Sequence, residues 1–424
     1  MDVITSAQDV LHLIQAAGEL GEDLATAERL IKAQLAQIGQ KALQIHLDRH
    51  PDLGYQGPHR DCSCGQRQRF VEYRPRTLKT VLGEATLQRA YYHCPKCGRG
   101  CVPYDEQAGL GPMAVSPGLA QLACELSVDL PFAKAAGKLA ALTGLQLSAS
   151  SIERLTRRVG AVADRHEQAE AARMETWQPP PTAPAVAGRL YMSVDGVMAP
   201  MRAGWEEIKA AVCYWRDADG ALHQRYRART EKIDGFVPHA WAVAAACGLA
   251  GCRQSVLLGD GATWIWERVG PVLDPDVEIV DWYHACEHLW EAGQVVYGEG
   301  TPACTQWVET LKNLLWKGKM GALLDRLKQT LKALRSPAKR QALEALRGYV
   351  QGHRKQMAYD RFRDQGLDIG SGLIESACRT VVQERLKRPG TRWLPANAQR
   401  VLSLRVCHLN GDWDAFWKNR PLAA

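Results

Sequence analysis

The sequence predicts a multidomain α/β protein: a mixed sheet flanked by helices, an α-helical insertion, and smaller N-terminal modules. Three observations predict this class. Past residue 188, apolar strand-like runs alternate with helix-like segments. Five of the 13 cysteines fall between positions 62 and 101, around an alternating, β-like stretch. With 424 residues and 46% hydrophobic content, the chain can bury several cores.

The formal charge of +7 is unevenly distributed. From Thr301 to the C-terminus, 23 Lys and Arg residues stand against 10 Asp and Glu residues. A basic C-terminal third favours nucleic acid as a partner. No apolar run approaches the roughly 20 residues of a membrane span, and residues 1–20 lack the pattern of a signal peptide. We therefore expect a cytoplasmic protein with no membrane partner.

Residues 1–58 are predicted to form one or two amphipathic helices, because leucine and isoleucine recur at helical spacing. Residues 59–104 are predicted to form a zinc ribbon, with a hairpin that turns at Gly83. Two pairs of thiolates at the ends of such a hairpin can enclose one tetrahedral, structural Zn²⁺. The predicted ligands are Cys62, Cys64, Cys94 and Cys97.

The first cysteine pair has one intervening residue, where two are commoner. This spacing leaves the fourth zinc ligand open, and a hairpin of reduced cysteines without metal is the alternative. The other candidates for the fourth ligand are Cys101, His59 and His93.

Residues 105–176 are predicted to form a helical, helix-turn-helix-like DNA-binding domain. A helix over 132–142, a turn at Thr143 and Gly144, and a second helix over 150–164 give the motif. An arginine-rich second helix can enter a major groove, although basic helical hairpins also occur in proteins that never meet DNA. The predicted contacts are Arg154, Arg157 and Arg158.

A proline-rich linker over residues 177–188 marks the clearest domain boundary. Residues 189–297 then give three strands in hairpin succession, followed by alternating helices and strands. This is the order of a ribonuclease H-like fold. In that order Asp195 ends the first strand and Asp260 the fourth, so both reach the same edge of the sheet.

Residues 298–366 are predicted to form a basic α-helical insertion that lies along DNA, with Lys317 and Lys319 as contacts. The alternative is a solvated bundle whose leucines pack among themselves. Residues 367–424 complete the core with a helix that carries Glu375 and with a C-terminal tail. The tail supplies three predicted phosphate contacts, Lys387, Arg388 and Arg392.

Asp195, Asp260 and Glu375 form the pattern of a carboxylate triad. Three acidic groups repel one another when they are brought together, and a pair of hard divalent cations is the usual compensation. Two such cations can activate a nucleophile and stabilise a leaving oxygen in phosphodiester chemistry.

Taken in order, these motifs resemble the ISKra-type insertion-sequence transposases, bacterial members of the DDE class. The matching blocks are residues 80–98, 193–196, 257–261, 279–284, 370–376, 387–393 and 402–405. One departure is Asn397-Ala398, where a Gly-Ala pair is expected before the C-terminal helix.

The resemblance implies that Asp195, Asp260 and Glu375 bind two Mg²⁺ (or Mn²⁺) ions. It implies cleavage of double-stranded DNA at the element ends and transfer of the released 3′-hydroxyl to target DNA. Because two ends must be joined, we expect a homodimer or higher oligomer. His284 would contact the scissile phosphate or a catalytic carboxylate; alternatively, Asp281 and His284 only tie a strand to the next helix.

Two other classes stay open. A transposase-derived DNA-binding protein would keep the zinc ribbon and the helix-turn-helix without relevant catalysis, but it would be expected to lose a triad carboxylate. Another metal-dependent nuclease would share the fold without needing the N-terminal modules or the basic insertion.

Overall fold

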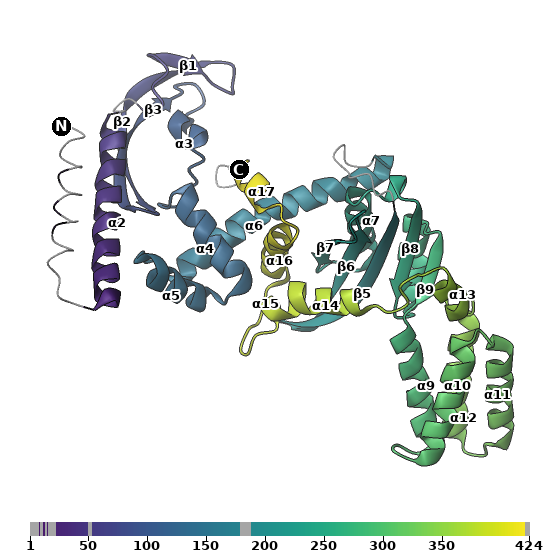
Figure 1. Cartoon of the computed structure of the whole chain (residues 1–424). Helices are drawn as coiled ribbons and strands as arrows, with labels where there is room; N and C mark the ends of the chain where they lie inside the picture. The colour runs from purple at the N-terminus through teal and green to yellow at the C-terminus, as the bar shows by residue number, and fades with distance from the viewer. Residues whose placement is uncertain are drawn as a thin grey trace. The chain divides into compact units, whose positions relative to one another are not determined.

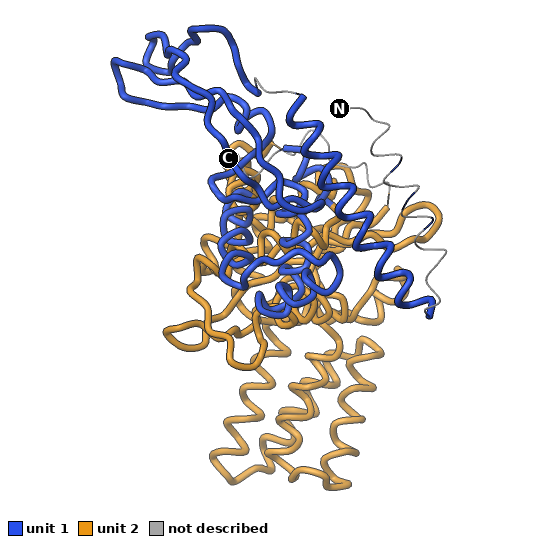
Figure 2. Tube along the Cα trace, turned by 90° about the vertical axis from the view of Figure 1, so that its left-hand side faces the viewer, with its two compact units in different colours: residues 1–162, 412–424 blue, residues 163–411 orange. Residues whose placement is uncertain are grey.

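The computed structural model describes residues 8, 12, 15, 23–49, 53–178 and 188–419. The chain divides into two compact units, residues 1–162 with 412–424 and residues 163–411 (Figure 2). The boundary falls within helix α6 (Ala149–Ala172). No described helix is long and apolar enough to cross a membrane.

Unit 1 contains a four-stranded antiparallel sheet in the order β1-β2-β3-β4. Its strands are β1 (His59–Asp61), β2 (Arg67–Thr80), β3 (Gly83–His93) and β4 (Gly100–Cys101). The central hairpin closes with Thr80 paired to Gly83, which has a φ of +115°. A left-handed backbone of this kind favours glycine, and the predicted turn is confirmed.

Helix α2 (Leu24–Asp48) lies against β3 and begins at Asp23, whose side chain caps the first turn. Gln44 hydrogen bonds to the backbone of Thr86 in both directions, at 2.8 and 2.9 Å. The helix confirms the second half of the predicted N-terminal pattern. Most of the first half, including Leu11, Ile14 and Leu20, lies outside the described residues.

The helices that follow the sheet are α3 (Pro103–Gln107), α4 (Pro117–Asp129), α5 (Phe132–Thr143) and α6. Gly144 ends α5 in the left-handed conformation, and the Ser148 side chain caps the start of α6. The two predicted helices and the turn between them are therefore present. Helix α6 runs to Ala172 rather than ending at 164, because residues 167–172 are good helix formers with no breaking residue.

Unit 2 is built on a five-stranded mixed sheet in the order β7-β6-β5-β8-β9 (Figure 1). Its strands are β5 (Arg189–Met201), β6 (Gly204–Arg216), β7 (Leu222–Arg229), β8 (Gln254–Gly259) and β9 (Val277–Val280). Strands β5, β6 and β7 are antiparallel, whereas β5, β8 and β9 are parallel. The predicted strand succession is confirmed, and β5 and β6 extend beyond their predicted ends into a long hairpin.

Helices cover both faces of this sheet. Helix α7 (Ile233–Ala246) packs on the side chains of Leu190, Met192 and Val194. Helix α9 (Trp282–Tyr297) belongs to the core of the other face, which contains Tyr191, Val256 and Leu258. Because alternate strand residues point to opposite faces, odd positions of β5 and even positions of β8 face α9. A π-helical turn over Ile265–Val269 leads into α8 (Gly270–Leu273) between β8 and β9.

The insertion consists of α10 (Pro302–Trp316), α11 (Met320–Ala333), α12 (Pro337–Gly352) and α13 (Tyr359–Asp364). Its leucines form one buried core with α9, as the solvated-bundle alternative requires, while Lys317 and Lys319 remain exposed. The chain then returns through α14 (Gly372–Ala377), a π-helical turn (Cys378–Gln383), α15 (Glu384–Leu386) and α16 (Pro395–Leu409). Helix α17 (Trp413–Lys418) belongs to unit 1.

Candidate functional site

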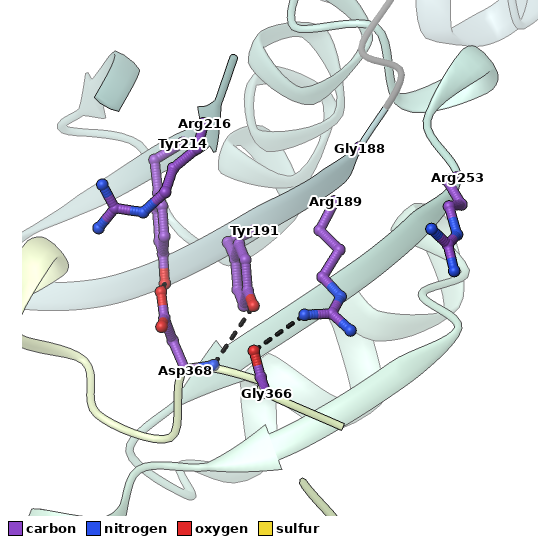
Figure 3. A pocket seen from close by; sticks show the side chains of 8 residues that line it. All are labelled: Gly188, Arg189, Tyr191, Tyr214, Arg216, Arg253, Gly366 and Asp368. Atoms are coloured by element: carbon purple, nitrogen blue, oxygen red, sulfur yellow. Dashed lines mark hydrogen bonds between the residues drawn. The ribbon is translucent and has the colours of Figure 1, made fainter. Parts of the chain in front are cut away.

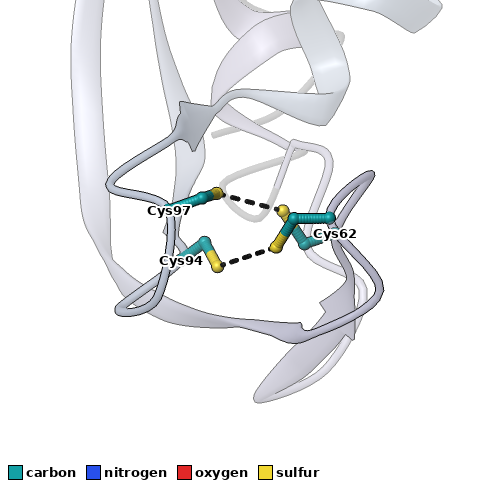
Figure 4. Close-up of side chains that lie close together, drawn as sticks. Cys62, Cys94 and Cys97 are labelled. Carbon is teal, nitrogen blue, oxygen red and sulfur yellow. Dashed lines mark hydrogen bonds between the residues drawn. The ribbon is translucent and has the colours of Figure 1, made fainter.

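The four predicted zinc ligands lie together at the end of the unit 1 sheet. Cys62 and Cys64 follow β1, Cys94 and Cys97 follow β3, and all four Sγ atoms lie within 4.8 Å of one another (Figure 4). Two of the Sγ–Sγ distances, Cys62 to Cys97 and Cys64 to Cys94, are 3.7 Å. A tetrahedron with metal–sulfur bonds of about 2.3 Å has edges of about 3.8 Å. The four cysteines can therefore bind a metal ion such as zinc.

Backbone N–H groups in the two cysteine turns favour thiolates. The N–H of Cys97, followed by that of Lys96, lowers the pKa of Cys94 to about 6. The N–H of Cys64 lowers the pKa of Cys62 in the same way. At Cys64 the N–H of Gln66 lowers the pKa, but the neighbouring thiols and burial raise it to about 11. A bound cation would overcome this repulsion, since thiolate is the form that binds metal.

The structure settles which side chains belong to this cluster. Cys101 lies outside it: its Sγ is 2.9 Å from Arg60 Nη1 and 3.5 Å from the side-chain oxygen of Gln68. Among the described residues, neither His59 nor His93 joins the cluster. The geometry therefore favours the predicted set of Cys62, Cys64, Cys94 and Cys97 over the alternatives for the fourth ligand.

Asp195 of β5 and Asp260, which directly follows the parallel strand β8, lie in unit 2 where β8 ends. The prediction that Asp195 ends its strand is wrong, because β5 continues to Met201 in its hairpin with β6. We call this place the acidic edge. Ser193 of β5 is paired with Leu258 of β8, and each aspartate lies two residues beyond its member of that pair. Both carboxylates therefore point to the α9 face. Burial raises the pKa of Asp195, and the charge of Asp260 raises it further.

Contacts of Asp195 bring the third acidic segment to the same edge. Its Oδ1 accepts a hydrogen bond from the Gly196 N–H (2.6 Å), and its Oδ2 accepts one from the Cys378 thiol (3.5 Å). Cys378 follows directly on α14, which lies against β5 and β6 and carries the exposed Glu375. Burial, Asp195 and Glu375 all raise the pKa of Cys378. Nothing in the sequence around Cys378 pointed to this contact.

The elements that carry Asp195, Asp260 and Glu375 contact one another, but the three carboxylates are not grouped as the cysteines are. Among the described residues, the four cysteines have their ligand atoms within 4.8 Å of one another, whereas Asp195, Asp260 and Glu375 do not form such a group.

The turn after Asp260 is held by a residue of the helical insertion. Asp260 Oδ1 accepts the Ala262 N–H at 2.8 Å, and its carbonyl accepts the Tyr349 hydroxyl at 3.3 Å. Gly261 has a φ of +96°, and a Cβ there would lie 2.7 Å from Tyr349 Oη. Glycine after Asp260 is therefore required by both backbone and space. Nothing in the sequence of α12 pointed to Tyr349.

Asp281 joins two motifs that are far apart in the sequence. It is fully buried and caps α9, with its Oδ1 accepting the His284 N–H at 2.7 Å. Its Oδ2 accepts the N–H of Ser371, and the Trp282 N–H bonds to the Ile369 carbonyl at 2.9 Å. Asp281 therefore ties the start of α9 to the segment that precedes Glu375, a wider role than the expected tie between β9 and α9.

The surroundings of His284 raise its pKa and so favour its cationic form at neutral pH. Its Nδ1 lies 3.2 Å from Asp281 Oδ1, and its side chain is 33% exposed. The hydrogen bond with Asp281 is the main reason that the pKa of His284 is raised to about 9, whereas burial alone would lower this pKa. The charges of Asp281, Glu287 and Asp260 add to this increase. The arrangement gives the acidic edge one positively charged hydrogen-bond donor.

A pocket of about 420 Å³ lies at the opposite, amino-terminal end of β5 (Figure 3). Arg189 donates to the carbonyls of Gln365 and Gly366 at 2.5 and 2.8 Å. The rings of Tyr191 and Tyr214 are stacked, and both hydroxyls bind Asp368. The Tyr214 hydroxyl donates to the Asp368 carboxylate, and the Tyr191 hydroxyl accepts the Asp368 N–H, each at 3.3 Å. These contacts hold the chain where it returns from the insertion toward Glu375.

The predicted DNA contacts differ in exposure. On α6, Arg154 is exposed, Arg157 forms an ion pair with Glu153 at 3.6 Å, and Arg158 is partly buried. Arg388 and Arg392 are exposed on the loop after α15, and Lys387 is partly buried there.

A match to one protein family spans most of the chain. No curated protein matches the chain. The sequence model of an uncharacterised protein family, UPF0236, matches residues 23–418. This range includes both the cysteine cluster and the acidic edge. The chain therefore belongs to the uncharacterised protein family UPF0236.

Proposed function

We propose that this chain is a DDE transposase that cuts and joins DNA strands at the ends of a mobile element. One observation carries the proposal: Asp195 and Asp260 share one face of adjacent parallel strands, and the helix of Glu375 packs against β5. The order β7-β6-β5-β8-β9, with three antiparallel strands followed by two parallel ones, supports a ribonuclease H-like core.

The acidic edge fits divalent cations. Charge on Asp195 is opposed by burial and by Asp260, and a cation would relieve both effects. Carboxylate oxygens are the ligands that Mg²⁺ and Mn²⁺ prefer, so Asp195, Asp260 and Glu375 would hold two such ions. Bound there, the ions would activate the attacking hydroxyl and stabilise the leaving oxygen.

Other residues bind and orient DNA in this proposal. The imidazolium of His284 donates a hydrogen bond to a phosphate oxygen, while the buried Asp281 keeps the ring charged and oriented. Lys317, Lys319, Lys387, Arg388 and Arg392 contact phosphates, and such contacts make binding strongly salt dependent. In unit 1, a zinc ion held by the cysteine cluster stabilises the sheet, and the arginines of α6 recognise the terminal repeats. The protein acts in the bacterial cytoplasm as a dimer or higher oligomer.

The test is cleavage of end-labelled DNA that carries the terminal repeats of the encoding element. Reactions contain Mg²⁺, Mn²⁺ or EDTA, and compare wild type with Glu375→Gln and Asp260→Ala. We expect metal-dependent nicking at the repeat boundary in the wild type alone, with repeat binding retained in both variants. Cleavage by Asp260→Ala would overturn the assignment of the triad. Specific binding without cleavage by any of the proteins would instead favour a transposase-derived DNA-binding protein.

A further inference from the structure

The end of the β5–β6 hairpin carries an unusually exposed aromatic residue. The hairpin continues past the acidic edge until Met201 pairs with Gly204. Just after this turn, the side chain of Trp205 is 62% exposed. An indole left in water at a fixed position of a strand is informative, because large apolar side chains gain free energy by burial.

A hydrogen-bonded connection fixes the loop after α15 to this hairpin end. The N–H of Arg202 donates to the Trp393 carbonyl at 2.8 Å, and the N–H of Trp393 donates to the Pro200 carbonyl at 3.1 Å. Trp393 itself is buried, and its indole donates to the Leu386 carbonyl at 3.2 Å. In Figure 1 the loop follows α15 beside the end of the hairpin. Residues 387–393 and the hairpin end therefore form one surface.

One lysine lies beside the exposed indole, and three arginines lie on the same two segments. Lys387 Nζ lies 5.8 Å from the centroid of the Trp205 ring. Arg202, Arg388 and Arg392 are exposed on the two joined segments. Two acidic residues, Glu206 and Glu207, follow on β6, and Glu207 is paired with Lys209 at 2.6 Å. We call Arg202, Trp205, Lys387, Arg388 and Arg392 the Trp205 surface.

The Trp205 surface lies along the same strand as Asp195. Asp195 and Pro200 are both residues of β5, five positions or about 17 Å apart, and the Pro200 carbonyl accepts the N–H of Trp393. A strand bound near Asp195 would therefore pass close to this surface. Cations interleaved with an exposed aromatic ring are typical of sites that hold unpaired nucleotides, where phosphates meet the charges and a base stacks on the ring.

We propose that the Trp205 surface binds DNA beside the cleavage site, with Trp205 stacking on an unpaired base and the four cations contacting phosphates. This inference rests on the proposed function, and it adds a substrate feature to it: at least one nucleotide next to the cut is unpaired in the bound state.

The experiment compares two DNAs that contain the same terminal repeat, in EDTA so that no cleavage occurs. One is fully paired, and the other has a short unpaired segment at the repeat boundary that carries 2-aminopurine. Full-length wild type is compared with Trp205→Ala, Trp205→Phe and Trp177→Ala. Trp177 is a matched control, because it is also a tryptophan of unit 2 and is 58% exposed.

We expect Trp205→Ala to bind the partly unpaired DNA roughly tenfold more weakly, since one stacked base contributes about 1–3 kcal/mol. Its affinity for the paired DNA changes less than twofold, and the 2-aminopurine signal of stacking is lost. Trp205→Phe keeps part of the affinity, and Trp177→Ala behaves as wild type. Equal loss on both DNAs, or no loss on either, would overturn the inference.

The cleavage test of the triad separates this inference from the proposed function. A wild type that cleaves, together with a Trp205→Ala protein that binds both DNAs normally, rejects the inference alone. Selective loss in Trp205→Ala without metal-dependent cleavage rejects the transposase and keeps the surface. A wild type that binds neither DNA rejects both.

Discussion

Replacing Asp281 by asparagine tests how the acidic edge is held together. Asparagine keeps one side-chain oxygen, which can still cap α9 by accepting the His284 N–H. It places an amide where the second oxygen accepts the N–H of Ser371, and it removes the negative charge beside His284. The substitution therefore breaks the connection to the Glu375 segment and changes the protonation of His284.

The size of the effect follows from burial. Ser371 is 3% exposed, so its N–H would lose its partner away from water, which costs about 1–3 kcal/mol. The ion pair with His284 is about one-third exposed, so its loss adds only about 0.5–1 kcal/mol. A total of about 1.5–4 kcal/mol corresponds to a roughly 10- to 900-fold increase in local opening.

Hydrogen exchange read by mass spectrometry measures this opening directly. We expect peptides that cover residues 366–376 to exchange faster by that factor in Asp281→Asn, while peptides of β2 and β3 keep their wild-type rates. The matched control is Asp276→Asn, since Asp276 also accepts a backbone N–H, that of Ser255 at 2.7 Å. This control should loosen the start of β8 and leave residues 366–376 unchanged.

Titration of His284 gives a second readout of the same change. In the wild type the raised pKa of about 9 means that the Asp281–His284 pair stabilises the fold fully below the ordinary pKa of 6.5. That contribution is lost as pH rises from 6.5 through 9. In Asp281→Asn, the histidine should titrate near its ordinary value. Unchanged exchange over 366–376 together with an unchanged His284 titration would refute the assigned role of Asp281.

Three further predictions concern the other parts of the structure. Purified protein should contain one zinc per chain by elemental analysis, and Cys94→Ser should lose it, whereas Cys101→Ser should retain it because Cys101 lies outside the cluster. Gly261→Ala should lower the thermal stability by about 1–3 kcal/mol, because a Cβ at a φ of +96° meets Tyr349; unchanged melting would contradict this. Strand cleavage by the wild type should fall as pH rises through about 9, and this decline should be absent in His284→Gln.

Much of the local structure could be predicted because its signals are local. Strands β8 and β9 and the apolar parts of β5 and β6 appear as short apolar runs, and cysteine spacing indicates the metal cluster. The length of the β5–β6 hairpin was underestimated, because Pro200 weakens the strand pattern of β5. Pro200 is paired with Trp205 of β6, and this pairing cannot be read from the sequence of β5 alone.

Contacts between distant segments left no such signal. Tyr349 reaches the Asp260 turn from α12, and Asp281 reaches Ser371 across the whole insertion. One sequence shows which residues can make these contacts but not which pairs do. The partial burial of Arg158 was missed for the same reason, because a basic residue on a helix does not reveal what packs beside it.

These distant contacts explain how a large insertion can separate Asp260 from Glu375. The chain leaves the sheet at Val280 and Asp281, and it returns within hydrogen-bond reach of the same two residues. Val280 donates to the Gln356 carbonyl at 3.0 Å and accepts the Tyr359 hydroxyl at 2.9 Å, while Asp281 binds the Ser371 N–H. A segment whose two ends are fixed side by side adds little loop-closure entropy as it grows, about 0.6 kcal/mol per doubling of length.

It follows that the insertion can change in length without moving the helix of Glu375. What must be preserved is the connection at its base, which consists of Asp281, Ser371 and the contacts of Tyr359. A variant that shortens α10 and α11 at their far ends should keep the raised pKa of His284, whereas a change at Tyr359 should not. The fold therefore requires precise geometry in the segments that flank the insertion and in α13, beside the acidic edge, and leaves the outer helices free to serve binding.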